Sequence, residues 1–455
     1  MNGSVFARLH GRGHQGFRGP AARGGGARGR KLFAGRAHAP AMDAPPAPQP
    51  GGFRWACGLS DAPDLERAVG DACASVEQAL GGARTDLAVL FVSAGFADRY
   101  DEAARLVHGR LQPRAMVGTT GMGVIGVGRE VEERPAVSVS AGALPGVSLA
   151  PFRVDARKVE ELDVSPANWS AFLGTPLRDD VHFLLFAHPF TAPTDDLVAA
   201  LDQAYPTGRK VGGLASGGNT PETMALFLGE DTYYDGAVGC AIWGDVAFDV
   251  IVAQGCRPVG PQLKVTKAAG THLFELDGER ALDRVMAVLN AIPEDERILA
   301  RRTVFVGVAM EAHEKEGGGP YDGGYLVRNI MGGDRETGAL HVGHQLREGQ
   351  TVRLQVRDAR TADQELVEML RRYGEARGEG APPAAAFMFQ CNGRGTNLFG
   401  REGHDAQAFE RALGRLPLAG FFCNGEIGPV GEVTYLHGYT SSIGILRAKG
   451  PGRSG

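Results

Sequence analysis

The sequence predicts an α/β protein built of mixed β-sheets with crossover helices and arranged as two pseudo-related subdomains. One observation is that a strand–helix–strand unit recurs, and its second strand opens each time into a glycine-rich loop. Such units pair their strands through a crossover helix. Three copies at this spacing are too few for a solenoid. The copies span residues 87–123, 181–218 and 384–428.

The elements of each unit follow from hydrophobic periodicity. A short apolar run indicates a buried strand, and apolar residues three and four apart indicate a helix. The predicted crossover helices are residues 100–111, 194–205 and 405–413. Another helix is expected at residues 64–80, with Asp61 or Asp64 as its cap. Between the units, hairpin-like strands are predicted at residues 136–141, 303–308 and 350–356, and at 237–243 paired with 246–254.

Composition limits the classes of protein to which this chain can belong. With 455 residues, 43% of them hydrophobic and 22% charged, it has ordinary globular usage and room for two or more cores. The longest apolar runs are far shorter than the roughly 20 residues that span a bilayer, so no membrane span is expected. Residues 1–42 hold seven Arg, one Lys and no acid; without these eight cations the net charge of −5 becomes −13. An acidic body argues against nucleic acid as a partner.

The Arg-rich, acid-free start is typical of an organellar transit peptide, which we assign to residues 1–42. It predicts a protein of the chloroplast or mitochondrion. The alternative is that Met42 is the true start, which predicts a cytoplasmic protein. Residues 43–53 are interpreted as a Pro-rich linker. The two subdomains are expected at 54–255 and 256–447, with a disordered tail at 448–455.

No cofactor or metal is predicted from the remaining motifs. Gly121-Met-Gly-Val-Ile-Gly126 has the spacing of a dinucleotide loop, but the chain runs on into another strand and not into a helix. His341 and His344 lie in strand-like sequence without a third ligand, which favours a structural pair. The six cysteines are scattered without a CxxC pair, which favours reduced thiols in an intracellular compartment.

Two similar turns in the last third predict a binding site. Cys391-Asn392-Gly393-Arg394 follows one apolar strand, and Cys423-Asn424-Gly425-Glu426 follows another. If these strands are neighbours, both turns meet at one sheet edge, where open α/β sheets bind their ligands. An Arg fork can hold a carboxylate, and Glu can hold an ammonium group. The alternative is that Arg394 and Glu426 pair with each other and brace the two turns.

The order of several segments carries a family resemblance over about residues 84–447. These segments are 117–120, 211–213, 255–260 with 265–267, 325–330, 349–352, 357–359, 389–395 and 418–428. Together they resemble the FIST family (F-box and intracellular signal transduction), with both its N- and C-terminal domains. Some members carry an F-box, but residues 1–53 lack the Leu-rich helical content that an F-box needs. The resemblance is therefore to a stand-alone form.

The resemblance implies a sensory module that binds a small ligand, with amino acids among the candidates, and it supplies no catalytic residues. We expect a sensor for an amino acid or small carboxylate whose polar anchors lie in the two turns and at the junction of the domains. One alternative is an adaptor that recruits a protein partner. Another is an enzyme with a Cys391 or Cys423 thiolate, although buried structural thiols are the more common case. The candidate ligand-binding residues are Arg394, Glu426, Asn424, Asn392, Cys391, Cys423 and Arg257.

Overall fold

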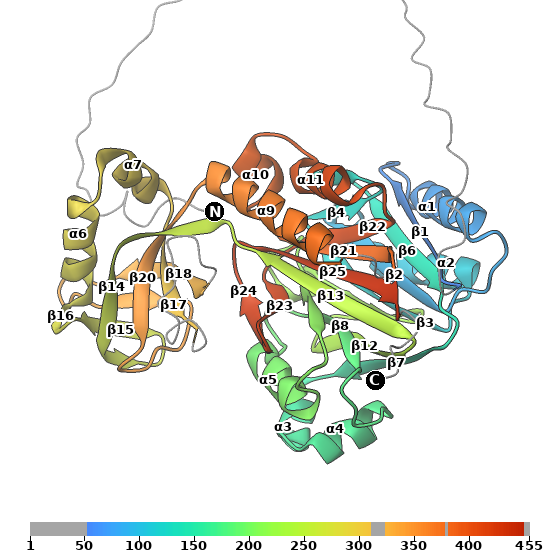
Figure 1. Ribbon diagram of the computed structural model, residues 1–455, viewed down its shortest axis with the longest axis horizontal. Helices are drawn as coiled ribbons and strands as arrows, with labels where there is room; N and C mark the ends of the chain where they lie inside the picture. Colours follow the sequence, from blue (N-terminus) through green and yellow to red (C-terminus); the bar gives the residue numbers. More distant parts are fainter. Residues whose placement is uncertain (1–51, 311–323, 378–380, 450–455) are drawn as a thin grey trace, which may run out of the picture.

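Three six-stranded sheets with the same strand arrangement form the body of the protein in this computed structural model, which describes residues 52–310, 324–377 and 381–449 (Figure 1). Each sheet has a parallel pair at its centre and two antiparallel strands on either side. The first sheet has the order β1 (Arg54–Ser60), β6 (Val137–Ala143), β2 (Leu87–Ser93), β3 (Ala115–Gly121), β10 (Leu226–Leu228) and β11 (Asp231–Tyr233).

The other two sheets repeat this order. The second is β24 (Val433–His437), β23 (Glu426–Val430), β9 (Lys210–Leu214), β8 (His182–Ala187), β12 (Ala237–Gly244) and β7 (Val147–Val154). The third is β13 (Val246–Ala253), β25 (Ser441–Ala448), β21 (Pro383–Cys391), β22 (Leu418–Cys423), β4 (Gly123–Gly126) and β5 (Arg129–Glu132). The predicted class of mixed sheets with crossover helices is confirmed, and the repeat within the body is threefold.

Crossover helices join the parallel strands as predicted. They are α2 (Tyr100–Leu111), α5 (Thr194–Ala204) and α11 (His404–Leu413). Helix α1 (Leu65–Leu80) packs its apolar stripe on the first sheet, and Asp64 caps it by accepting a hydrogen bond from the Arg67 N–H at 3.0 Å. Shorter helices are α3 (Ala156–Leu162), α4 (Pro166–Leu173) and α10 (Gly395–Phe399). Within the described residues, no helix combines the length and hydropathy needed to cross a membrane.

The three units are tied together by an exchange of hairpins. The β4–β5 hairpin follows β3 in the first unit but pairs with β22 of the third. The β10–β11 hairpin of the second unit pairs with β3 of the first. The β23–β24 hairpin of the third unit pairs with β9 of the second. Each unit therefore completes the sheet of another, and the body closes as one cycle.

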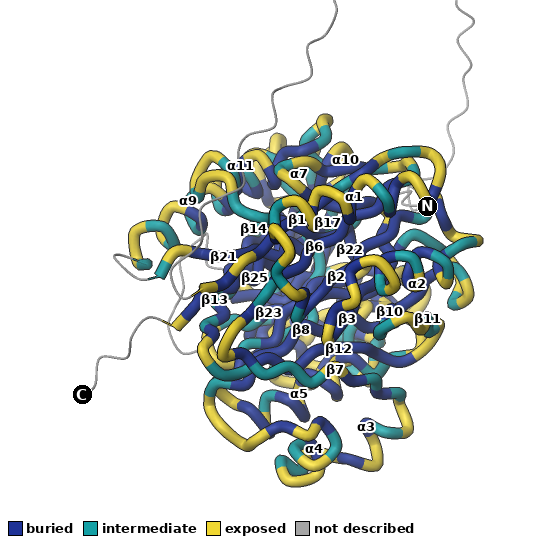
Figure 2. Tube along the Cα trace, turned by 90° about the vertical axis from the view of Figure 1, so that its right-hand side faces the viewer, coloured by how far each residue is buried: buried dark blue, intermediate teal, exposed yellow. Residues whose placement is uncertain are grey.

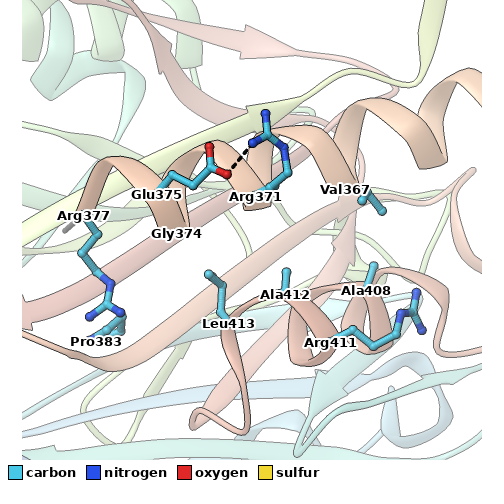
Figure 3. Close-up of a pocket in the computed structure, with 10 residues that line it drawn as sticks. All are labelled: Val367, Arg371, Gly374, Glu375, Arg377, Pro383, Ala408, Arg411, Ala412 and Leu413. Carbon is cyan, nitrogen blue, oxygen red and sulfur yellow. Dashed lines mark hydrogen bonds and ion pairs between the residues drawn. The ribbon is translucent and has the colours of Figure 1, made fainter.

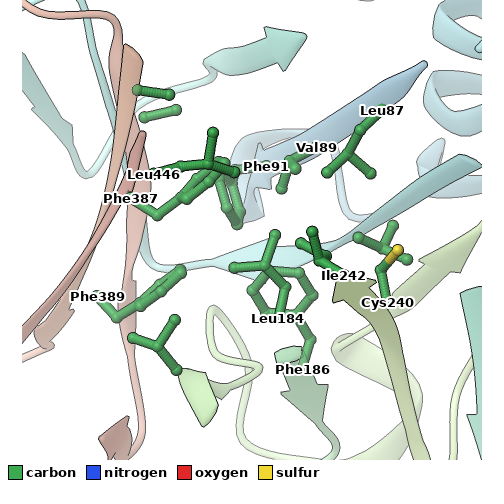
Figure 4. Close-up of a cluster of buried hydrophobic side chains, with 14 of the residues drawn as sticks. Leu87, Val89, Phe91, Leu184, Phe186, Cys240, Ile242, Phe387, Phe389 and Leu446 are labelled. Carbon is green, nitrogen blue, oxygen red and sulfur yellow. The ribbon is translucent and has the colours of Figure 1, made fainter. Parts of the chain in front are cut away.

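The three sheets share one apolar core at the middle of this cycle (Figure 4). Phe91, Phe186 and Phe389 occupy equivalent positions on β2, β8 and β21, and all three are fully buried. Their ring centroids lie 5.6 Å (Phe91–Phe186), 6.3 Å (Phe91–Phe389) and 5.8 Å (Phe186–Phe389) apart. Figure 2 shows the strands of the body as mostly buried and the outer turns of the helices as exposed.

A fourth sheet forms a separate lobe, inserted into the third unit between β13 and α9 (Ala359–Arg377) (Figure 1). It has its own apolar core and carries α6 (Ala281–Ala291) and α7 (Glu294–Arg302). Its strand order is β14 (Cys256–Ala269), β20 (Thr351–Arg357), β17 (Val304–Ala309), β18 (Tyr325–Gly333), β19 (Leu340–Val342), β15 (His272–Leu276) and β16 (Glu279–Arg280). The boundary expected between residues 255 and 256 is the point where this lobe begins.

One predicted pairing is wrong. Residues 237–243 and 246–254 were expected to form a hairpin, but β12 pairs with β7 and β8 in the second sheet, whereas β13 pairs with β25 in the third. Gly244 has a φ of +107° and turns the chain from one sheet to the next instead of back on itself. The predicted transit peptide, most of the linker and residues 450–455 of the predicted tail lie outside the described residues, whereas Ala448 ends β25.

Candidate functional site

The two Cys-Asn-Gly turns lie side by side, as the sequence predicted. Strands β21 and β22 are parallel neighbours, and Cys391 is paired with Cys423 at their carboxyl ends. The Asn392 backbone N–H donates to the Cys423 carbonyl at 3.0 Å. The Asn392 side-chain amide donates to Oδ1 of Asn424 at 2.8 Å. The turns therefore converge at one sheet edge.

Ser216, two residues after the end of β9 in the second sheet, joins these turns to the rest of the body. Its hydroxyl donates to Oδ1 of Asn392 at 3.2 Å and accepts from the Met122 N–H at 2.8 Å. The Asn424 amide donates to the Ala215 carbonyl at 2.9 Å. In the sequence, the only sign of Ser216 is that it follows a buried strand.

Arg394 does not pair with Glu426, so the predicted brace between the two turns is wrong. Its Nε and Nη2 atoms instead lie 2.5 Å and 3.2 Å from the two carboxylate oxygens of Asp405, at the start of α11. Both side chains are fully buried, whereas Nη1 of Arg394 has no hydrogen-bond partner among the described residues. Because Asp405 is eleven residues away, beyond the short helix α10, no local pattern identifies it as the partner.

Glu426 is fully buried and is bound by Thr440. Its Oε2 accepts hydrogen bonds from the Thr440 backbone N–H at 3.0 Å and the Thr440 hydroxyl at 2.7 Å. Burial raises the pKa of Glu426 to about 7, and the hydrogen bonds from Thr440 only partly oppose this. A carboxyl group in this state can donate or accept a proton near neutral pH.

The cysteines of the turns are protonated thiols at neutral pH. Burial, with the nearby Glu426 carboxyl, raises the pKa of Cys391 to about 11 and that of Cys423 well above its usual value. Cys423 donates through Sγ to the Gln390 carbonyl at 3.1 Å. Since a thiolate is the nucleophile in cysteine catalysis, these environments disfavour the cysteine-enzyme alternative.

Arg257 lies apart from the two turns, in a cavity between the inserted lobe and α9. Its Nη1 is 2.8 Å from Oε1 of Glu296, and its Nε is 3.6 Å from Oδ2 of Asp358. The cavity has a volume of about 540 Å³ and is lined from the lobe by β14, β18 and β20 and from the body by α9. Residues in its wall include Gln254, Cys256, Arg257, Gln355, Glu365 and Met369.

Two groups in this cavity have unusual environments. Gln355 is 1% exposed, and its side-chain nitrogen has no hydrogen-bond partner among the described residues. Burial raises the pKa of Glu365 to about 7, while a hydrogen bond from the Gln254 backbone and the charge of Arg394 oppose the rise. Buried polar groups without partners are rare in folded proteins and are often explained by a bound species.

Arg357 connects the cavity with the Cys391 turn. It lies opposite Cys256 across β14 and β20, and two residues after Gln355 on the same strand. Side chains two apart on a strand, and side chains directly opposite each other, share one face of a sheet. Its guanidinium stacks on Tyr439, 5.2 Å from the ring centroid, and packs against Gly393, where an added Cβ would lie 2.2 Å from Nη1. In the sequence, residues 357–359 stand out only through their family resemblance.

A second hollow lies between α9 and α11 and is lined by Val367, Arg371, Gly374 and Leu413 (Figure 3). Arg371 is engaged there by Glu375 and Glu368. Among the histidines, His341 stacks on His272 with ring centroids 5.1 Å apart. Within the described ranges, no group of three or more His, Cys, Asp or Glu side chains is arranged to hold a metal ion.

Comparison with known proteins agrees with the two-subdomain organisation. Residues 86–279 match the FIST N domain, and residues 281–429 match the FIST C domain. The two matched domains share sheets, since β4 and β5 of the first pair with the third sheet and β23 of the second pairs with the second sheet. They also divide the inserted lobe between them, because β14 to β16 fall in the first domain and β17 to β20 in the second.

Relatives and solved structures give the following similarities. An uncharacterized protein of Mycobacterium tuberculosis (strain H37Rv) is 35% identical over 395 residues, which are 87% of this chain and 100% of that protein. An uncharacterized protein of Mycobacterium bovis is 33% identical over 394 residues, 87% of this chain and 99% of that protein. A cyanuric acid hydrolase from A. caulinodans is 9% identical, with a TM-score of 0.31 over 88% of this chain and 100% of that chain. A TM-score this low does not establish a shared fold, whereas the domain matches and the relatives do establish a family. The chain therefore belongs to the FIST family of sensory signal-transduction proteins.

Proposed function

We propose that this protein is a sensor that binds a small polar ligand, an amino acid or a small carboxylate, in the cavity between the inserted lobe and α9. The single observation that carries the proposal is the side-chain nitrogen of Gln355, which is buried in the cavity wall and has no hydrogen-bond partner among the described residues. An unpaired buried donor costs roughly 1–3 kcal/mol, and a ligand acceptor at that position removes the cost. The cavity is of the size that small-molecule sites have.

Glu365 is a second residue of the cavity that could bind a polar or charged group of the ligand. It lies in the same wall, and its pKa of about 7 allows it to accept a hydrogen bond from an ammonium group or to donate one to an acceptor. Its partner in the free protein is a backbone N–H of Gln254. A protonated amine placed here would lower the pKa of Glu365 by favouring its charged form.

The connection of the lobe to the body suits a sensory role. The chain enters and leaves the lobe at adjacent positions, since Cys256 and Arg357 pair across β14 and β20. A ligand in the cavity touches the lobe on one side and α9 on the other. If the lobe can take two positions relative to the body, the ligand would favour the position that it binds more tightly. The size of this shift is set by the difference between its affinities for the two positions.

A thermal-shift screen of the full chain with the L-amino acids and with acetate, succinate and related small carboxylates tests this proposal. A ligand at a hundred times its dissociation constant adds about 2.7 kcal/mol to the free energy of unfolding. We expect Gln355→Leu to abolish the shift, whereas Gln364→Leu, at an exposed glutamine of the same cavity, should keep it. A panel that leaves the melting temperature of well-folded wild type unchanged rules the proposal out.

Delivery to a chloroplast or mitochondrion stays a prediction from the composition of residues 1–42. Fusion of these residues to a fluorescent protein tests it. Import followed by removal of the segment is the expected result, and diffuse cytoplasmic fluorescence would favour Met42 as the start.

A further inference from the structure

We infer that the Nε–Nη2 edge of Arg357 is a carboxylate-binding subsite next to the cavity, so that the sensed ligand carries a carboxylate group. This inference rests on the proposed function and assigns a chemical group of the ligand to one residue. Both nitrogens are buried, and neither has a hydrogen-bond partner among the described residues. This edge carries the two parallel N–H bonds that grip a carboxylate.

Arg394 provides an internal comparison. Its own Nε and Nη2 atoms are bound side-on by the two oxygens of Asp405, at 2.5 Å and 3.2 Å. The same edge of Arg357 has no hydrogen-bond partner, and Arg357 forms no ion pair, within the part of the chain that the structure describes. Arg394 and Asp405 neutralise each other, whereas Arg357 is a positive charge near the Cys391 turn without an ion-pair partner among the described residues. A guanidinium with one positive charge and two adjacent N–H donors is complementary to a carboxylate in charge and geometry.

The guanidinium of Arg357 is held in place before any ligand binds. Tyr439 supports it from one side by a cation–π contact of 5.2 Å. The backbone of Gly393 supports it closely enough that a side chain at that position would collide with Nη1. A preorganised fork loses little side-chain freedom when it binds, which increases affinity.

The position of Arg357 places the carboxylate at one end of the ligand. Gln355 precedes Arg357 by two residues on β20 and lies in the cavity wall, while Cys256 of the wall is directly opposite Arg357. The Nε and Nη2 atoms are themselves buried, so a carboxylate bound there is shielded from water and its hydrogen bonds are strengthened.

Paired ligands and three variants test the subsite. Each acid that raises the melting temperature of the wild-type protein is compared, by isothermal titration calorimetry, with its own methyl ester or primary amide. We expect Arg357→Met to lower the affinity for the acid by about 10- to 100-fold. Arg357→Lys should lower this affinity by roughly 10-fold, because lysine keeps the charge but loses the two parallel N–H donors. Arg353→Met on the same strand is the matched control, since Arg353 Nε is already bound to the Gly260 carbonyl at 2.8 Å.

A second measurement needs no ligand. Removing an unpartnered buried guanidinium costs the free protein little, so Arg357→Met should melt at the wild-type temperature or above. Arg394→Met should melt clearly lower, because it leaves Asp405 buried and unpaired. If Arg357→Met falls as far as Arg394→Met, the fork is already occupied in the free protein and the inference is wrong.

The outcomes separate this inference from the proposed function. If an acid binds wild type and Arg357→Met equally well, or if the ester binds as tightly as the acid, the subsite is wrong while the sensor stands. If nothing in the panel binds wild type, the proposed function fails, and the carboxylate ligand fails with it.

Discussion

Arg394 and Asp405 form a fully buried ion pair in which Nε and Nη2 of the guanidinium face the two oxygens of the carboxylate. Asp405 also accepts a hydrogen bond from Nδ1 of His404 at 2.7 Å, and the charge of Arg394 keeps the pKa of Asp405 below its usual value despite burial. The pair fixes the start of α11 against the Cys391 turn. The turn can therefore hold its shape next to the inserted lobe.

Arg394→Met should destabilise the protein by about 3–5 kcal/mol, because it leaves a buried carboxylate without its partner. Urea unfolding followed by circular dichroism measures the change. Arg447→Met is the control, since its pair with Asp249 has side chains that are 26% and 28% exposed, and such pairs contribute at most about 1 kcal/mol. Equal losses in the two variants would contradict the structural role of Arg394.

The threefold repeat predicts that Gly118, Gly212 and Gly420 are equally intolerant of substitution. An added Cβ would lie 2.0 Å, 1.7 Å and 1.8 Å from the carbonyl oxygens of Leu90, Leu185 and Met388, respectively. Each alanine variant should lose about 3 kcal/mol or more, because two backbones in a parallel pair must separate. Gly109→Ala, in α2 and with open space around it, should be neutral or gain up to about 1 kcal/mol. Chemical denaturation of the four variants tests the repeat.

Glu426 should make stability fall as pH rises toward neutrality. Its pKa is about 7 in the folded chain against a normal 4.5, so the folded state holds more protons than the unfolded state between these values. The free energy of unfolding therefore falls between pH 4.5 and 7, by on the order of 3 kcal/mol from this group. Glu426→Gln should lack this component, and the exposed Glu432→Gln should keep it. Urea unfolding at several pH values gives the difference, and parallel curves for Glu426→Gln and wild type would refute it.

The thiols of Cys391 and Cys423 should alkylate slowly at pH 7. With the pKa of Cys391 at about 11 and that of Cys423 well above normal, the thiolate fraction at Cys391 is about 100-fold lower than in a free cysteine. Iodoacetamide labelling followed by mass spectrometry, with the urea-unfolded chain as reference, measures both rates. Fast labelling of either thiol in the folded protein would revive the cysteine-enzyme alternative.

Local sequence determined the repeating units and the meeting of the two turns. Apolar periodicity marks each strand and crossover helix within about thirty to forty residues, and parallel strands joined by such a helix end at the same sheet edge. The hydrogen bond between Asn392 and Asn424 follows from this arrangement, because both residues come directly after their strands. The likeness of the segments to one family also required only their order along the chain.

Only the tertiary structure decided which charges face each other and which sheet each hairpin joins. Arg394 pairs with Asp405 and not with Glu426, and the hairpin after β3 pairs with β22. Both outcomes depend on residues distant in sequence, because a buried charge needs an opposite charge and a strand edge needs a paired strand. Arg357 became notable for the same reason: its Nε–Nη2 edge has no partner among the residues that the structure describes, which periodicity cannot reveal. Local propensity thus determined the elements of this protein, while long-range packing and electrostatics determined its candidate site.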